Sequence, residues 1–314
     1  MILTITPDAH IERTFLVSGL TLGSELKAEQ EVVMPAGTGV SISLVLKELR
    51  AQTLAAGLVA GFNGDYFLDL LDHLFVPNQF FRTNGETSTS FHLVEFDRRR
   101  ETNTASVTMF GLPDHADQLH SLLRNHTEET SAVVLGGSLI SGLPLNTFRR
   151  LIEEAHSLNL MTVLHATGRG LKEALEACPD LLRLTREDLS RLHPDFSDMS
   201  RPVSILIPKL RERLGNWAAD AIMVLLAPHI ALAVTRDGVF QGVAEEVPFV
   251  NRSGVEEAFT AGVTLSYLKN RSWKEALPLG LAAASATILQ VGKAVCRRKD
   301  VEAILPTVEV KTMG

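Results

Sequence analysis

The apolar and polar positions of the chain alternate in two different ways, and the pattern changes at about residue 116. Beyond that point, short continuous apolar runs predict strands at residues 132–135, 161–164, 181–183 and 221–226. Apolar residues at helical spacing predict helices at residues 116–125, 147–158, 170–177, 186–192 and 208–217. Short apolar strands joined by helices are typical of a parallel sheet covered on both faces, so an α/β fold is expected.

The first 110 residues hold more extended segments than such a sheet requires. Strands are predicted at residues 2–6, 14–17, 26–34 and 54–60, and helices at 42–50 and 66–74. Extended segments at 87–96 and 105–110, joined by the charged residues 98–103, predict a hairpin. Near the other end, a strand pair at 231–234 and 239–243 precedes helices at 255–268, 273–291 and 299–304.

The composition narrows the class of protein. Hydrophobic residues make up 45% and charged residues 21% of the 314 residues, which is ordinary for a globular protein, and the net charge of −7 disfavours a nucleic-acid partner. The two cysteines, Cys178 and Cys296, form no motif and favour a reduced, cytoplasmic protein. Residues 1–8 lack the basic start of a signal peptide, and the Ala- and Gly-rich residues 277–291 suit a buried helix, so no membrane partner is expected.

Residues 248–262 are the stretch with the clearest chemical potential. They predict the end of a strand, a turn at Ser253 and Gly254, and a helix that buries Ala258 and Phe259. The first turn of a helix presents free backbone N–H groups and the positive end of the helix dipole. This stretch is therefore a natural place to hold a phosphate group.

The same stretch resembles the signature of the PfkB (ribokinase-like) sugar kinases, Asn-Thr-Val-Gly-Ala-Gly-Asp-Ser-x-x-Ala-Gly. The structural letters match at Asn251, Gly254, Ala261 and Gly262. The residues that carry the chemistry differ. Glu256 stands in place of the glycine of the anion hole, and Glu257 stands in place of the aspartate that serves as base.

The resemblance extends along nearly the whole chain and is closest to the 1-phosphofructokinase and tagatose-6-phosphate kinase branch. Residues 1–6 are similar to the opening of that branch, and residues 35–43 to its Pro-Gly-Gly-Lys-Gly-Ile-Asn segment. Residues 137–144, 164–168 and 181–189 follow the order of its later loops. The resemblance implies one ribokinase-like domain over residues 1–314, a doubly wound sheet with a small β lid formed by segments 13–34 and 87–110, and a homodimer joined through the lid.

The resemblance also implies the residues of the site. The catalytic pair would be Glu257 as base and Gly254 in the anion hole. A sugar or sugar phosphate would be bound by Glu12, Gly37, Thr38, Gly39, Ser41, Ser88, Ser138 and His165. The nucleotide would be bound by Thr185, Asp188, Leu226, Ala227, Asn251 and Glu256. ATP and Mg²⁺ are the cofactors if the protein is active; no metal-binding side chains are expected, since His115 and His120 are five residues apart and have no Cys nearby.

Most of the differences from the family pattern are at positions where the family has polar functional residues. An asparagine and an aspartate near the start become Asp8 and Glu12, and a lysine becomes Thr38. An arginine of the lid falls on Ser88, and an aspartate after a strand becomes His165. The Lys-Pro-Asn segment becomes residues 183–185, with Asp188 in place of a magnesium-linked glutamate, and residues 225–230 replace a Gly-containing nucleotide loop.

These changes weigh against phosphoryl transfer, a reaction that depends on positioning and on charge stabilisation. A carboxylate at Glu256 would face the phosphate, and two like charges about 4 Å apart repel by roughly 4 kcal/mol at an effective dielectric near 20. The loss of the family's lysine and arginine removes the compensation. A lost or much reduced transfer is therefore expected.

A structural interpretation explains the same residues. Ser253 and Glu256 have the spacing of a capping box, which contributes about 1 kcal/mol to helix stability, and the helix dipole favours Glu257. The protein's own carboxylate would then fill the anion hole. As a base, Glu257 carries one methylene more than aspartate, which displaces its oxygens in a step that tolerates little misplacement.

Three hypotheses remain open from the sequence. The chain could be a sugar or sugar-phosphate kinase with an altered site that uses Glu257, or a non-catalytic member that binds a small ligand or a partner. It could also be a kinase for an unusual, unphosphorylated substrate, which would fit the missing lysine and arginine. The residues favour the non-catalytic member.

Overall fold

The main body of the protein is a ten-stranded sheet, seen in a computed structural model that describes residues 1–314 except 22, 107–108, 197–202 and 314. The strand order is β14-β13-β12-β11-β10-β9-β8-β1-β4-β5. From β11 to β5 neighbouring strands are parallel, and from β11 to β14 they are antiparallel. The bounds are β1 (Ile2–Thr6), β4 (Thr53–Ala60), β5 (Asn78–Thr83), β8 (Ala132–Gly137), β9 (Met161–Ala166), β10 (Leu181–Leu184), β11 (Ala221–Ala227), β12 (Ile230–Thr235), β13 (Gly238–Val243) and β14 (Glu309–Met313).

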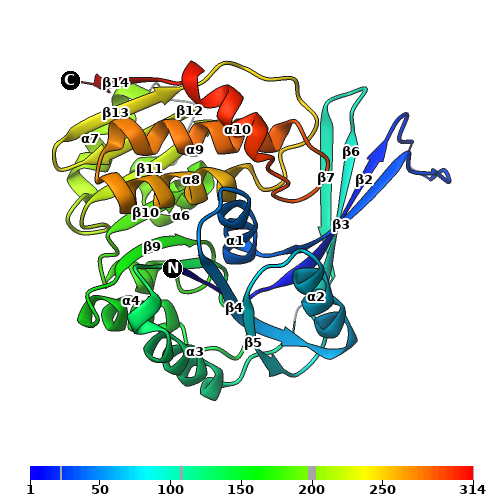
Figure 1. Ribbon diagram of the computed structural model, residues 1–314, viewed down its shortest axis with the longest axis horizontal. Helices are drawn as coiled ribbons and strands as arrows, with labels where there is room; N and C mark the ends of the chain where they lie inside the picture. The colour runs from blue at the N-terminus through cyan, green and yellow to red at the C-terminus, as the bar shows by residue number, and fades with distance from the viewer. Residues whose placement is uncertain (22, 107–108, 197–202, 314) are drawn as a thin grey trace.

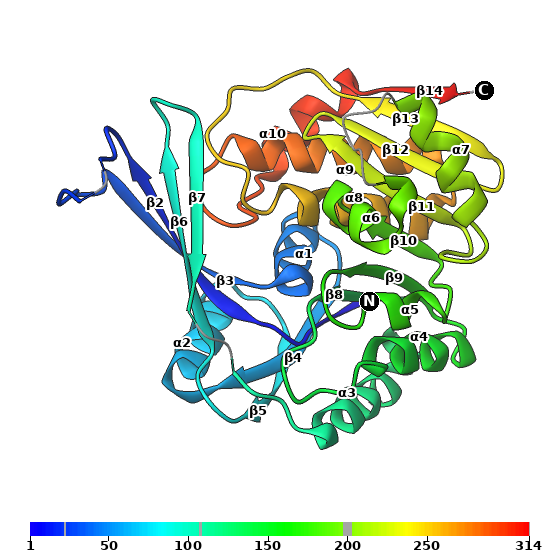
Figure 2. The same ribbon diagram turned by 180° about the vertical axis from the view of Figure 1, so that it is seen from behind.

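Helices cover both faces of this sheet. In front of it in Figure 1 lie α1 (Thr38–Glu48), α8 (Val255–Asn270), α9 (Trp273–Ile288) and α10 (Arg298–Ile304). The other face, turned forward in Figure 2, carries α2 (Gly61–His73), α3 (Pro113–Asn125), α4 (Thr147–Ser157), α5 (Leu171–Leu175), α6 (Arg186–Leu192) and α7 (Val203–Arg213). Neighbouring residues of one strand enter different cores, as Val133 and Val134 of β8 do, because side chains alternate across a sheet. The expected α/β fold is confirmed.

Helices α8 and α9 pack closely, and their contact fixes the helix that follows the signature stretch. A Cβ added at Gly262 would lie 2.8 Å from the Cα of Gly280, so a side chain cannot be accommodated there. Ala258, Phe259 and Ala261 of α8 are fully buried, as the sequence predicted. Within the described residues, no helix combines the length and apolarity needed to cross a membrane.

A second, four-stranded sheet projects from the main body on one side (Figures 1 and 2). Its order is β3 (Gln30–Ala36), β2 (His10–Val17), β6 (Ser88–Glu95) and β7 (Arg100–Ala105). Strands β2 and β6 are parallel and the other pairs antiparallel. We call it the smaller sheet. Five of its polar side chains are buried, namely Glu12, Thr14, Ser88, His92 and Glu95.

Several element boundaries differ from the sequence predictions. Helix α1 begins at Thr38 instead of residue 42. In its first turn, Val40 N donates a hydrogen bond to Thr6 Oγ1 (3.0 Å). Helix α2 begins at Gly61 instead of residue 66, because the Glu86 carboxylate accepts hydrogen bonds from its first turn. Helix α7 begins at Val203 instead of residue 208. The second hairpin strand is β7 and not residues 105–110, of which 107 and 108 lie outside the described residues.

Candidate functional site

The site forms where the loop before α8 meets the smaller sheet and the segment that follows α9. Asn251, fully buried, accepts a hydrogen bond from Ser253 N at Oδ1 (2.7 Å) and donates from Nδ2 to Gln290 O. Ala294 N donates to Ser253 O (3.1 Å). Asn251 is the residue that was predicted to bind the nucleotide. Its hydrogen bonds instead shape the loop before α8 and attach it to residues 289–297.

Gly254 is the N-cap of α8 and has a φ of +88°, in the left-handed region that favours glycine. A Cβ there would collide with the backbone of Ala294. The predicted capping box of Ser253 and Glu256 is wrong, because the N-cap lies one residue later and no side chain caps it. Ser253 Oγ donates instead to Glu12 Oε1 (2.6 Å).

Glu257 forms an ion pair with Lys293, whose Nζ lies 2.8 Å from Glu257 Oε1. Only 11% of the Glu257 side chain and 16% of the Lys293 side chain are exposed. Burial would lower the pKa of Lys293, but Glu257 and Glu12 outweigh it and raise that pKa, so the ammonium stays charged at neutral pH. The sequence analysis missed Lys293, although it is the lone charged residue between Glu275 and Arg297.

Glu256 pairs with Arg183, whose Nη2 lies 2.8 Å from Glu256 Oε1. Arg183 is fully buried at the end of β10, and its Nη1 also donates to His165 Nε2 (2.8 Å). Both carboxylates at the start of α8 therefore have a cation. The expectation that these carboxylates lack compensating positive charge is therefore wrong.

His165 is held inside a chain of hydrogen bonds. Burial, and then the nearby Arg183 guanidinium, lower the pKa of His165 well below its usual value, so the ring is neutral. Its Nε2 accepts from Arg183, its Nδ1 donates to Thr260 Oγ1 (3.0 Å), and Thr260 Oγ1 donates to Glu256 O (2.9 Å). With both ring nitrogens engaged, His165 positions Arg183 and the first turn of α8.

The smaller sheet meets the loop before α8 through buried charges. Glu101 Oε1 of β7 accepts from Arg252 N (2.6 Å), as Glu12 of β2 accepts from Ser253. His92 of β6 lies between them, 3.6 Å from Glu12 Oε1 and 3.5 Å from Glu101 Oε1. Burial would lower the pKa of His92, but Glu101 and Glu12 raise it to about 9. Burial would raise the pKa of Glu12, but His92, Lys293 and Ser253 lower it to about 2.

Other residues predicted for the sugar lie around Asp8, at the end of β1. Asp8 Oδ2 accepts from Ser138 N (2.8 Å), while its buried Oδ1 has no hydrogen-bond partner among the described residues. Burial raises the pKa of Asp8. Ser41 is fully buried, and its Oγ also lacks a partner in the described part of the chain. Ser88 is buried in β6, opposite His10, and Gly37 is the N-cap of α1, which contains Thr38 and Gly39.

Two adjoining cavities lie on the other side of α8. One, of about 400 Å³, is lined by Leu225, Leu226, Ala227, Pro228, Arg252, Val255 and Glu256. The second, of about 560 Å³, shares Ala227, Pro228 and Arg252 with it, and Arg99 and Phe249 also line it. Together they form a groove, and three residues predicted for the nucleotide, Leu226, Ala227 and Glu256, line it.

Thr185 and Asp188, also predicted for the nucleotide, form the capping box of α6. Asp188 N donates to Thr185 Oγ1 (2.8 Å), and Asp188 Oδ2 accepts from Thr185 N (3.1 Å) and Oγ1 (2.6 Å). Asp188 is 3% exposed. No three His, Cys, Asp or Glu side chains gather as a metal site within the described residues.

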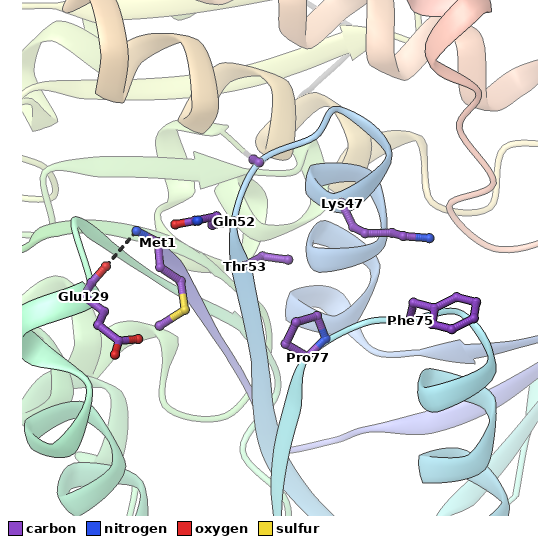
Figure 3. Close-up of a pocket in the computed structure, with 8 residues that line it drawn as sticks. Met1, Lys47, Gln52, Thr53, Phe75, Pro77 and Glu129 are labelled. Atoms are coloured by element: carbon purple, nitrogen blue, oxygen red, sulfur yellow. Dashed lines mark hydrogen bonds between the residues drawn. The ribbon is translucent and has the colours of Figure 1, made fainter.

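A further cavity of about 670 Å³ lies at the opposite edge of the sheet, where β1 and β4 begin (Figure 3). Lys47, Thr53, Phe75 and Pro77 are among its lining residues, and none of the predicted site residues is. Ligand crevices of open α/β sheets form at the carboxyl ends of the strands, so the chemistry is assigned to the groove side.

The chain belongs to the pfkB family of carbohydrate kinases, whose family model matches residues 8–300. The 1-phosphofructokinase of Bacillus subtilis (strain 168) is 27% identical over 312 residues, 99% of each chain. Two solved structures share the fold. Phosphofructokinase-2 from Escherichia coli in complex with potassium has a TM-score of 0.85 at 22% identity, over 97% of this chain and 98% of that one. A possible 1-phosphofructokinase from Thermotoga maritima has a TM-score of 0.87 at 18% identity, over 100% and 99%.

Proposed function

We propose that this member of the pfkB family binds a sugar or sugar phosphate next to a nucleotide, and that its phosphoryl transfer is lost or much reduced. The observation that carries the proposal is the ion pair of Glu257 with Lys293 at 2.8 Å, because Glu257 stands where the family signature has its base. The ammonium engages a carboxylate oxygen that would otherwise be free to reach a substrate hydroxyl. The extra methylene of glutamate adds a positional error to a step that requires close alignment.

The groove supports nucleotide binding. Its apolar part, Leu225 to Pro228, suits a base and ribose, and Arg252 and Arg99 provide charge for phosphates. The Cζ of Arg252 lies 5.1 Å from the centre of the Phe249 ring, which holds the guanidinium at the groove. ATP would supply the transferable phosphoryl group. Asp188, which stands in place of the family's magnesium-linked glutamate, uses its Oδ2 in the cap of α6.

A second candidate is an active kinase that uses Glu257 as base, and one observation favours it. Because Lys293 and Arg183 neutralise the two carboxylates at the start of α8, a phosphate would not meet uncompensated negative charge there. The neutral residues Thr38 and Ser88, which stand where the family has lysine and arginine, favour an unphosphorylated sugar for such an enzyme.

Binding and turnover should be measured on the same preparation. Calorimetric titration with Mg-ATP and ADP is expected to show binding, while turnover with a panel of hexoses and hexose phosphates stays below about 0.01 s⁻¹, against 1–100 s⁻¹ for typical kinases. Turnover in the ordinary range that falls in Glu257→Gln would overturn the proposal in favour of the active kinase. The absence of both nucleotide and sugar binding at millimolar concentration would reject both candidates.

We also propose that the smaller sheet acts as a lid over the sugar site and joins two copies of the chain in the cytoplasm. The contacts of Glu12 and Glu101 with the loop before α8 support the lid, because they bring β2 and β7 against the site. The stacked rings of Phe15 and Phe91, with centres 6.4 Å apart, support a contact between copies, since Phe91 remains 38% exposed.

A further inference from the structure

Lys293 lies at the centre of the charged groups of the site. It belongs to the segment that closes over the start of α8, where the neighbouring Ala294 donates to Ser253. Its ammonium interacts electrostatically with groups from four separate parts of the chain, namely Asp8, Glu12, His165 and the adjacent Glu256 and Glu257. Lys293 therefore lies within electrostatic reach of several charged groups, and Glu257 is its ion-pair partner.

The ammonium of Lys293 is only partly used. It carries three N–H donors, and the carboxylate of Glu257 is its one ion-pair partner within 4.0 Å among the described residues. The side chain of the lysine is 16% exposed and that of the glutamate 11%. The buried Oδ1 of Asp8, which lacks a hydrogen-bond partner among the described residues, marks a second incomplete polar contact near the same ammonium.

The other two buried cations of the site are less accessible. Arg183, whose side chain is 0% exposed, directs its guanidinium to His165 and Glu256. The His92 side chain is 2% exposed and lies between Glu12 and Glu101. Lys293, at 16%, has the most exposed side chain of these three cations, so a ligand anion at the first turn of α8 would meet it first.

We propose that Lys293 is the phosphate-binding cation of this site and that Glu257 is its counter-ion in the absence of ligand. This inference rests on the proposed function, since it assigns a residue to the anionic part of the ligand at that same site. The ligand chemistry is a phosphate monoester or a terminal nucleotide phosphate, which accepts hydrogen bonds from the ammonium as the carboxylate does. The phosphate and Glu257 compete for the positive charge of Lys293, so the carboxylate weakens phosphate binding while it remains paired with the ammonium.

The competition gives opposite effects for the two members of the pair. Glu257→Gln removes the competing charge and is expected to tighten binding of inorganic phosphate by about 10-fold, equivalent to about 1.4 kcal/mol. Lys293→Met is expected to weaken that binding by at least about 10-fold, and the double variant should behave like Lys293→Met. Calorimetry with inorganic phosphate, ADP, fructose 6-phosphate and fructose on each variant identifies which phosphate Lys293 binds, with fructose as the uncharged comparison.

Two controls separate this role from a structural one. Glu275→Gln removes a carboxylate charge from the exposed first turn of α9, outside the site, and leaves Lys293 and Glu257 paired, so it should change phosphate binding by less than about 3-fold. Equal tightening in Glu275→Gln and Glu257→Gln would overturn the proposal in favour of a general charge effect. A purely structural pair predicts lower melting temperatures in both single variants, recovery in the double, and equal anion affinity in all of them.

The outcomes also distinguish a failure of the role proposed for Lys293 from a failure of the proposed function. If the wild type binds ADP or fructose 6-phosphate and Lys293→Met binds them equally well, the role of Lys293 is rejected and the proposed function stands. If the wild type binds no phosphate-bearing ligand and no sugar at millimolar concentration, the proposed function itself is rejected.

Discussion

Gly254 is the residue on which the junction between the loop and α8 depends. Gly254→Ala combines a left-handed φ of +88° with a collision against Ala294, so we expect a loss of about 3 kcal/mol or more in the free energy of unfolding. Gly215 provides a matched control, with a φ of +90° and nothing within 4 Å of an added Cβ. Gly215→Ala should lose only about 1–2 kcal/mol in urea denaturation, the cost of the backbone conformation alone. Equal losses would show that the contact with Ala294 relaxes easily.

His165 has a positioning role that can be tested by stability. His165→Leu would leave the fully buried Arg183 without its neutral acceptor, and we expect a loss of about 2–4 kcal/mol in the free energy of unfolding. His165→Gln keeps an acceptor and a donor and should lose less than half as much. If the two variants are equally stable in urea denaturation, the hydrogen bonds from Arg183 and to Thr260 are not what holds this part of the site.

Residue-level pairings were the part of the site that the sequence analysis could not establish. Glu256 and Glu257 were correctly placed at the start of α8, but their partners are remote in sequence, at Arg183 and Lys293. Spacing along the chain reports local contacts such as caps, whereas these pairs depend on which loops the sheet brings together. The same reason explains the wrong capping box, since Ser253 has a partner on the smaller sheet in Glu12.

At the level of elements, the strands of the parallel core were predicted well and the edge strands were not. Strands β8 to β11 are short apolar runs covered on both faces, which is an unambiguous pattern. Strands β5 and β14 lie at the two edges of the large sheet and were missed. Their residues, such as the half-buried Asn78 and the exposed Lys311, give no continuous apolar run. Strand β7 was displaced because its charged residues at the edge of the smaller sheet were interpreted as a turn.

The attachment of the smaller sheet to the loop before α8 should depend on pH through His92. Its pKa rises from 6.5 to about 9 on folding, so the stabilisation is complete below pH 6.5 and is lost as the pH rises through about 9. We expect unfolding free energy to fall by up to about 3 kcal/mol between pH 6.5 and 9.5, and His92→Gln to remove most of this dependence. Urea denaturation across this range provides the measurement. A pH profile that is the same in both proteins would show that His92 is not charged between Glu12 and Glu101.

At the scale of the whole molecule, the exposed face of the smaller sheet predicts that the protein forms a homodimer. Phe91 and Phe15 stack on this face, Leu93 is half-buried beside them, and the Arg13–Glu31 ion pair (2.7 Å) borders them, the arrangement of an apolar centre with a polar rim. A homodimer through this face has twice the 34.3 kDa of the chain. We expect sedimentation equilibrium to give that mass for the wild type.

Two substitutions of the same residue type locate the contact. Phe91→Ser should raise the monomer–dimer Kd by at least about 30-fold, the loss of about 2 kcal/mol for an aromatic anchor. Phe75, which is 81% exposed beside the cavity at the opposite edge of the large sheet, is the control, and Phe75→Ser should leave the Kd unchanged. A monomeric wild type contradicts the assembly. A Kd that responds to Phe75→Ser and not to Phe91→Ser places the contact on the other side of the molecule, where it would leave both smaller sheets free to move over their sites.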